Sequence, residues 1–97
     1  MEHLEQARSL LDLLKRRSRE LEEIKQELND ASIDEMEALY AEEFRVAMDI
    51  SDVFETLNLL LDRMTENEDN MFLASRLRTQ AEAIIGNHTE YNFGEET

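Results

Sequence analysis

The chain has 97 residues and a formal net charge of −14 at pH 7, from 24 acidic side chains against 10 Lys and Arg. This length predicts one domain with a modest core, and the charge disfavours direct binding to nucleic acid or anionic membranes, because phosphate binding needs clustered cations. The absence of Cys excludes disulfides, thiolate catalysis and Cys-ligated metal sites.

The first expected helix covers about residues 3–30. Apolar side chains fill an alternating three- and four-residue spacing from Leu4 to Leu28, except at Ser18 and Lys25. This spacing is typical of an amphipathic helix with a heptad-like seam. Asn, Asp and Ser compete for local backbone hydrogen bonds, so we expect the polar stretch that follows to end the helix.

A second helix is expected over about residues 33–64. Ser32 and Glu35 have the S-x-x-E spacing of a capping box, in which each side chain bonds the other residue's backbone amide. An apolar seam runs along the whole helix and includes Ile33 and Tyr40, and additional apolar residues widen it. We predict that its later part forms either the core or a dimer seam, through Ile50, Phe54, Leu57 and Leu61.

A shorter third helix is expected over about residues 67–85. Either Thr65, in an S/T-x-x-E box with Glu68, or Asn67 is the expected cap. Gly86 is a helix-stop signal after the last apolar positions.

These elements predict an all-α fold, an antiparallel helical hairpin plus a third helix. Residues 1–86 are expected to form a single helical domain, and residues 87–97 a C-terminal tail. The second helix has more apolar surface than one neighbour would cover, so we also predict a homodimer, a dimeric helical bundle with coiled-coil-like packing.

Charge is concentrated at the expected turn of the hairpin. Residues 20–43, which we call the acidic tip, contain ten acids and one base, Lys25, a net charge of −9. Five bases lie before it, and we expect the cluster 15–19 to face acids across the hairpin, at Glu42, Glu43 and Asp49. The predicted partner-binding residues of the acidic tip are Glu20, Glu22, Glu23, Glu27, Asp30, Asp34, Glu35 and Glu37.

The concentration of carboxylates suggests a protein that acts by protein–protein interaction. Spaced carboxylates on a rigid helical tip resemble phosphates to a basic groove, as in small acidic inhibitors encoded by phages. The leading hypothesis is an inhibitor or modulator that presents a nucleic-acid-mimic-like surface to a basic partner, such as a nucleic-acid-binding protein. One alternative is a solvated acidic surface without a partner. Another is a helical adaptor or an export or assembly chaperone that binds an amphipathic segment in an apolar groove.

A third alternative is enzymatic. Glu23 and Glu27, followed by Asp49 and Asp52, resemble the all-α nucleotide pyrophosphohydrolases of the MazG type, which bind magnesium through an EExxE motif and a later ExxD motif. The sequence departs from both motifs, because Ile24 replaces the second Glu and Asp49 replaces the Glu of ExxD. We therefore predict no catalytic residues, no metal and no cofactor.

The sequence shows no targeting signal. No basic region precedes an apolar block near the N-terminus, and the longest uninterrupted apolar runs have only four residues, Ala38–Ala41 and Met71–Ala74. We expect neither a signal peptide nor a transmembrane span, and we predict a soluble protein of the cytoplasm, where chains without disulfides are common.

Overall fold

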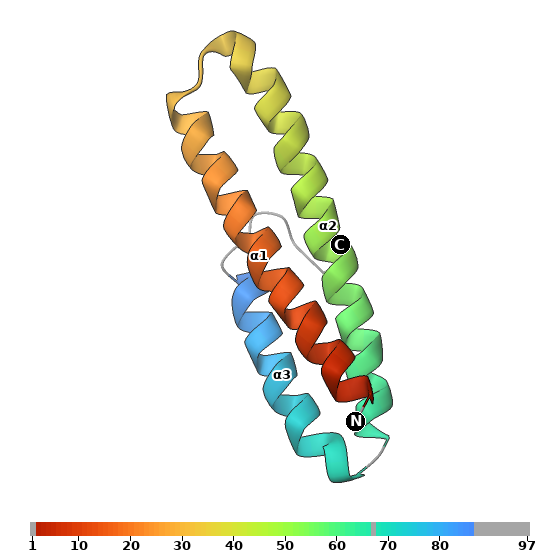
Figure 1. Ribbon diagram of the computed structural model, residues 1–97. Helices are drawn as coiled ribbons and strands as arrows, with labels where there is room; N and C mark the ends of the chain where they lie inside the picture. The colour runs from red at the N-terminus through yellow and green to blue at the C-terminus, as the bar shows by residue number, and fades with distance from the viewer. Residues whose placement is uncertain (1, 67, 87–97) are drawn as a thin grey trace.

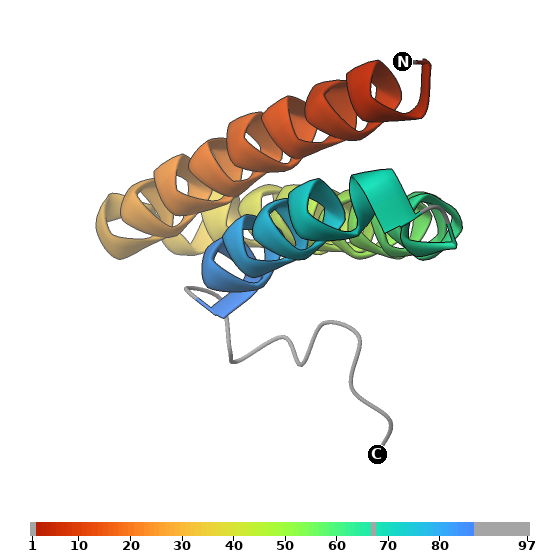
Figure 2. The same ribbon diagram turned by 90° about the horizontal axis from the view of Figure 1, so that it is seen from below.

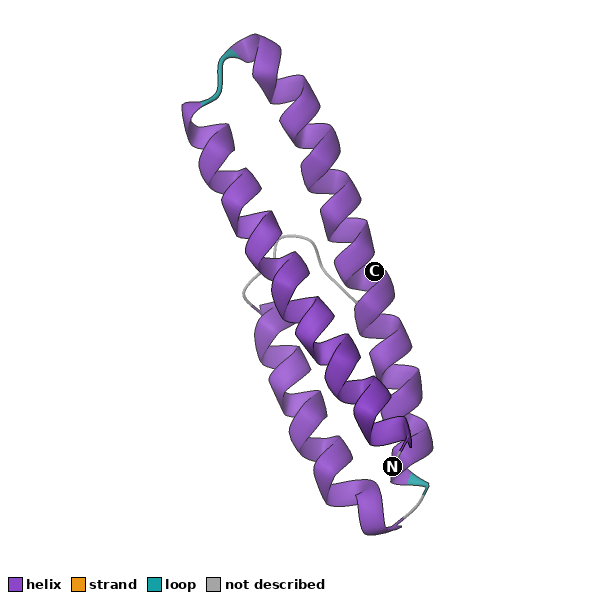
Figure 3. Ribbon diagram, in the orientation of Figure 1, coloured by secondary structure: helices purple, strands orange, loops and turns teal. Residues whose placement is uncertain are grey.

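Three α-helices make up the described part of the chain. The computed structural model describes residues 2–66 and 68–86, which form α1 (Glu2–Asp30), α2 (Ile33–Thr65) and α3 (Glu68–Gly86). Helices α1 and α2 form an antiparallel hairpin, and α3 turns back along one half of it (Figure 1). No strand occurs among these residues (Figure 3). The all-α hairpin with a shorter third helix is confirmed, whereas dimerisation stays a prediction.

The turn between α1 and α2 is short and capped. It consists of Ala31 and Ser32, and the amide of Ala31 donates to the carbonyl of Leu28 at 3.4 Å. Both halves of the capping box are present: the amide of Glu35 donates to the Ser32 hydroxyl at 3.4 Å, and the amide of Ser32 donates to Glu35 Oε1 at 3.0 Å. The hairpin therefore bends at a defined point, because the first amides of α2 are satisfied locally.

Thr65, one of the two residues predicted to cap α3, does not cap it, because α3 begins only at Glu68. Thr65 is the last residue of α2, and its hydroxyl donates to the carbonyl of Asp62 at 2.7 Å. This hydrogen bond ties Thr65 to α2. The other predicted cap, Asn67, lies outside the described residues.

The lengths of the helices divide the hairpin into two regions. The 33 residues of α2 extend about 50 Å at 1.5 Å per residue, whereas the 19 residues of α3 extend only about 28 Å. Figure 1 shows α3 ending midway along the hairpin, and Figure 2 shows it beside α2, with α1 across both. We call residues 3–19, 49–66 and 68–86 the three-helix base, and residues 20–48 the two-helix half.

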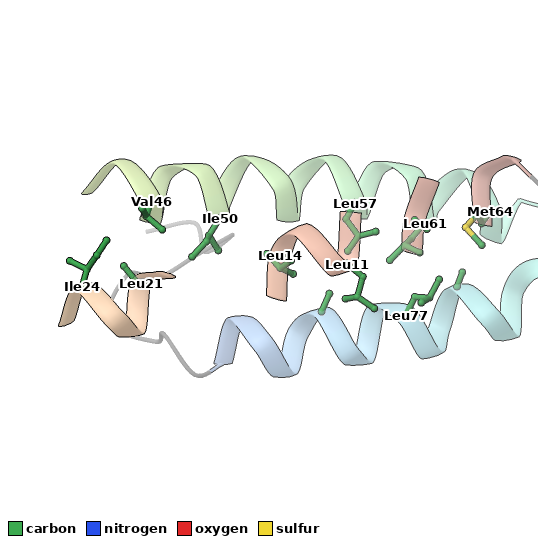
Figure 4. Packing of buried hydrophobic residues seen from close by; sticks show 13 residues of the cluster. Leu11, Leu14, Leu21, Ile24, Val46, Ile50, Leu57, Leu61, Met64 and Leu77 are labelled. Carbon is green, nitrogen blue, oxygen red and sulfur yellow. The ribbon is translucent and has the colours of Figure 1, made fainter. Parts of the chain in front are cut away.

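A continuous apolar core joins the two regions. In the base, Leu14, Leu57 and Leu61 have no exposed surface, and α3 adds fully buried alanines, Ala74 and Ala81. Such small side chains let helix backbones approach closely. Beyond the end of α3 the buried residues of this cluster come from α1 and α2 alone (Figure 4), namely Leu21, Ile24 and Val46.

The predicted core or dimer seam lies mainly inside the single chain. Ile50, Leu57 and Leu61 are fully buried, and Phe54 packs partly buried against the cluster. None of the helices in the described part of the chain is long and apolar enough to cross a lipid bilayer.

Candidate functional site

The hairpin turn brings the predicted acidic residues to one end of the molecule. Those before the turn lie on the last three turns of α1, and those after it lie on the first turns of α2 (Figure 1). Glu20 is half-buried, and the other seven are exposed: Glu22, Glu23, Glu27, Asp30, Asp34, Glu35 and Glu37. The carboxylates thus lie on both helices that meet at the turn.

Only part of this charge is neutralised within the chain. Arg17 Nη1 lies 2.6 Å from Glu20 Oε1, and Lys25 Nζ lies 3.9 Å from Glu22 Oε1. Within the described residues, Glu23, Glu27 and Glu37 form no ion pair. The acidic tip therefore keeps a strong negative potential, which attracts cations from solution.

Arg17 links the acidic tip to the base. Its Nε donates to Asp49 Oδ2 at 2.8 Å, across the hairpin, as expected for the basic cluster 15–19. The hydrogen bond and charge of Glu20 raise the pKa of Arg17 above its usual value, and Asp49 adds to this effect. Arg17 is therefore held as a cation between two carboxylates at the boundary of the two regions.

The other expected cross-hairpin pairs are not formed. Glu42 Oε1 accepts from Arg45 Nη2 at 2.5 Å on the same helix. Residues three apart on a helix are neighbours, so this local pair forms without bridging the hairpin. Glu43 is half-buried and has no ion pair in the described part of the chain. The prediction was wrong for these two acids.

Glu35 differs from the other predicted partner-binding acids because its carboxylate accepts a hydrogen bond from a backbone amide, that of Ser32. Hydrogen bonds from the amide and the hydroxyl of Ser32 lower the pKa of its carboxyl group. Its carboxylate thus stabilises the start of α2, which leaves it less available to a partner than Glu37, two residues later.

Part of the predicted seam of α2 is not buried. Ile33 is 86% exposed and Tyr40 is 55% exposed, although both continue the heptad spacing of the core. Phe44 and Met48 lie near them and are also exposed, at 67% and 50%. The reason is length, since α3 ends before it reaches this part of α2 (Figure 1). We call Ile33, Tyr40, Phe44 and Met48 the apolar patch.

Described residues of the base line a larger and a smaller groove. The larger, with a volume of about 770 Å³, lies between α1 and α2, and its apolar lining is Leu10, Leu59 and Leu60. The smaller, about 310 Å³, lies between α1 and α3 and is bordered by the cations Arg8, Lys15 and Arg76. Neither groove is lined by a residue of the acidic tip, so the predicted site lies outside both of them.

The acids of the MazG resemblance do not converge. Among the described residues no group of three or more Asp, Glu or His side chains is placed to hold a metal ion. Glu23 and Glu27 are exposed on α1, and Asp49 is occupied by Arg17. This arrangement gives the enzymatic alternative no geometric support.

Comparisons with protein-family models, with curated proteins and with solved structures found no match to this chain.

Proposed function

We propose that this protein binds a basic partner protein through its acidic tip and modulates or inhibits that partner. The observation that supports the proposal most directly is the separation of charge. Residues 20–48 contain ten acids and two bases, a net charge of −8, whereas the three-helix base contains ten acids and eight bases, a net charge of −2. A field this uneven steers a cationic surface to one end of the molecule.

The acids of the tip lie on two packed helices joined by a capped turn, which favours such binding. The capping box defines the turn, and Leu21, Ile24 and Val46 fix α1 against α2 behind the acids. Carboxylates on fixed helices lose less conformational freedom on binding than those on a flexible chain. A nucleic-acid-binding protein is a natural class of partner, because its basic groove already accepts spaced anionic groups.

Charge reversal confined to one region tests the proposal. The tip variant combines Glu23→Lys, Glu27→Lys and Glu37→Lys, three exposed acids without ion pairs. The control variant makes the same charge change in the base, through Glu5→Lys, Asp12→Lys and Glu82→Lys, three exposed acids away from the acidic tip. Both are compared with the parent chain for binding to partners captured from the host and then purified.

We expect the tip variant to lose binding and the control variant to keep it. Binding of the parent should also weaken steeply as salt rises, because the Debye length falls from about 10 Å at 0.1 M to about 3 Å at 1 M. Equal effects of the two variants would mean that total charge, and not the acidic tip, is responsible. Unchanged binding of the tip variant would refute the proposal.

A second candidate function is favoured by the larger groove of the base. Leucines form the apolar part of this open groove. An amphipathic segment of another protein could bind there, as in a helical adaptor or chaperone. Leu59 is 60% exposed there. Binding by this route should tolerate high salt and be lost in Leu59→Ser, whereas the tip variant should bind normally.

A further inference from the structure

The strip of α2 that lies along α3 can be followed by its heptad positions. Asp62 Oδ1 accepts from Arg78 Nη2 of α3 at 2.7 Å, which places this side of α2 beside α3. Leu61 is fully buried next to it, and the side-chain oxygen of Asn58 is inaccessible to solvent. These three positions mark the strip in the base.

The same strip continues into the two-helix half without a covering helix. Residues a whole number of heptads apart lie on the same side of a helix in a bundle. Three pairs share a heptad position: Tyr40 with Leu61, Phe44 with Asn58, and Met48 with Asp62. Tyr40 is 55% exposed, whereas Leu61 is completely buried. The apolar patch is therefore the continuation of the surface that α3 covers in the base.

Acidic side chains border this patch. Glu37 lies one heptad before Phe44, and Asp34 and Glu55 lie two heptads before and one heptad after Met48. All three acids are exposed. A helix lying on the patch would therefore bury an apolar stripe against the aromatic rings, and side chains toward its two ends would lie beside carboxylates.

Charge decides between the possible occupants. A second copy of the chain would bring two acidic tips together, each with a net charge of −9. Residues 87–97 of the same chain contain three acids and no Lys or Arg, so they too would add like charge. A helix with Lys and Arg beside its apolar stripe has the opposite charge and complements both features of the surface.

We infer that the apolar patch binds a cationic amphipathic α-helix of a partner protein, which lies along α2 where α3 would continue. This inference rests on the proposed function and specifies the partner's binding element. The patch spans 16 residues of α2, from Ile33 to Met48, or about 22 Å. About four turns of helix cover that distance.

The test uses two synthetic peptides of identical composition as probes. One places Leu at helical spacing on one face and Lys elsewhere, so that it forms a cationic amphipathic helix. The other contains the same residues in an order that gives no apolar face. Fluorescence anisotropy measures the affinity of each peptide for the full chain, and light scattering gives the mass of the free chain and of the complex.

A patch variant and a control variant distinguish binding to the apolar patch from binding by charge alone. The patch variant carries Tyr40→Ser and Phe44→Ser, and its control carries Phe72→Ser, which removes an aromatic side chain 73% exposed on α3. We expect the amphipathic peptide to bind the parent at least about tenfold more tightly than the scrambled peptide, because buried aromatics dominate such interfaces. The patch variant should lose that advantage, and the control should keep it.

The remaining outcomes are distinguishable. If both peptides bind equally and the patch variant changes nothing, the acidic tip captures cations but the inferred helix site is wrong. If neither peptide binds, the proposed function fails as well. A parent dimer that the patch variant converts to monomer would assign the patch to a second copy. Tighter peptide binding after Tyr91→Ser and Phe93→Ser would assign it to residues 87–97. Either result would overturn the inference.

Discussion

The base and the two-helix half are built from the same two helices, yet they differ in packing and in charge. In the base, α3 completes a core around Leu14, Leu57 and Leu61, and cations nearly balance the acids. In the two-helix half, Leu21, Ile24 and Val46 form a thin contact while the acids are mostly uncompensated. Hydrophobic packing in the base can thus support a charge distribution at the tip that by itself opposes folding.

The largest expected loss in the free energy of unfolding comes from replacing a buried leucine with alanine in each region. Leu61→Ala in the base should lower the free energy of unfolding by about 3–4 kcal/mol, because three helices surround the cavity that it leaves. Leu21→Ala should cost only about 2–3 kcal/mol, since a two-helix contact beside solvent collapses more easily. Urea unfolding followed by circular dichroism measures both. A larger cost at Leu21 would show that the two-helix half is the better packed region.

The next-largest loss of stability is expected at the turn between α1 and α2. Ser32→Ala removes the cap of α2 and should lower stability by about 1 kcal/mol at neutral pH. Hydrogen exchange should show faster opening in the two-helix half than in the base. Thr65→Ala, at the end of α2 in the base, is the control, because its hydroxyl only donates back to Asp62. A loss of protection in the base alone would contradict this prediction.

The contribution of the capping box should also depend on pH. Because the folded-state pKa of Glu35 is lowered, its stabilising effect is fully present above the unfolded-state pKa of about 4.3. That effect is lost as the pH falls through the lower folded-state pKa. The stability difference between the parent and Glu35→Gln should therefore shrink on acidification below about pH 4. A difference that stayed constant down to pH 2 would mean that the charge of Glu35 is irrelevant.

Salt should stabilise the two regions unequally. Screening weakens repulsion between like charges, each close pair of which costs a few tenths of a kcal/mol on a helix. The opening free energy of amides in residues 20–48 should therefore rise as salt increases from about 0.05 to 0.5 M, whereas amides in the base should change less. Hydrogen exchange at both salt concentrations makes the comparison. An equal rise in opening free energy in both regions would mean that the repulsion is not concentrated in residues 20–48.

Local sequence patterns predicted the helices, but they did not predict which apolar positions of α2 would be covered by another helix. Heptad spacing and the Ser32 capping box depend on nearby residues, so they located α1 and α2 correctly. The same spacing continues through Tyr40, yet no periodicity reports whether another helix reaches that position. The length of α3 relative to α2 was the available signal, since a helix of 19 residues covers only part of one of 33. The positions of the acids followed from the turn, whereas individual ion pairs depended on side-chain reach.

The smallest effect is expected where the two regions meet. Arg17 bonds Glu20 on its own helix and Asp49 across the hairpin, with a side chain 34% exposed. A double-mutant cycle with Arg17→Gln and Asp49→Asn should give a coupling of between about 0 and 1 kcal/mol, because exposed ion pairs are screened and entropically costly. The matched cycle on Arg78 and Asp62, which joins α3 to α2 in the base, should fall in the same range. A coupling well above this at Arg17 alone would mean that the ion pair, and not the apolar contact behind it, holds the two-helix half to the base.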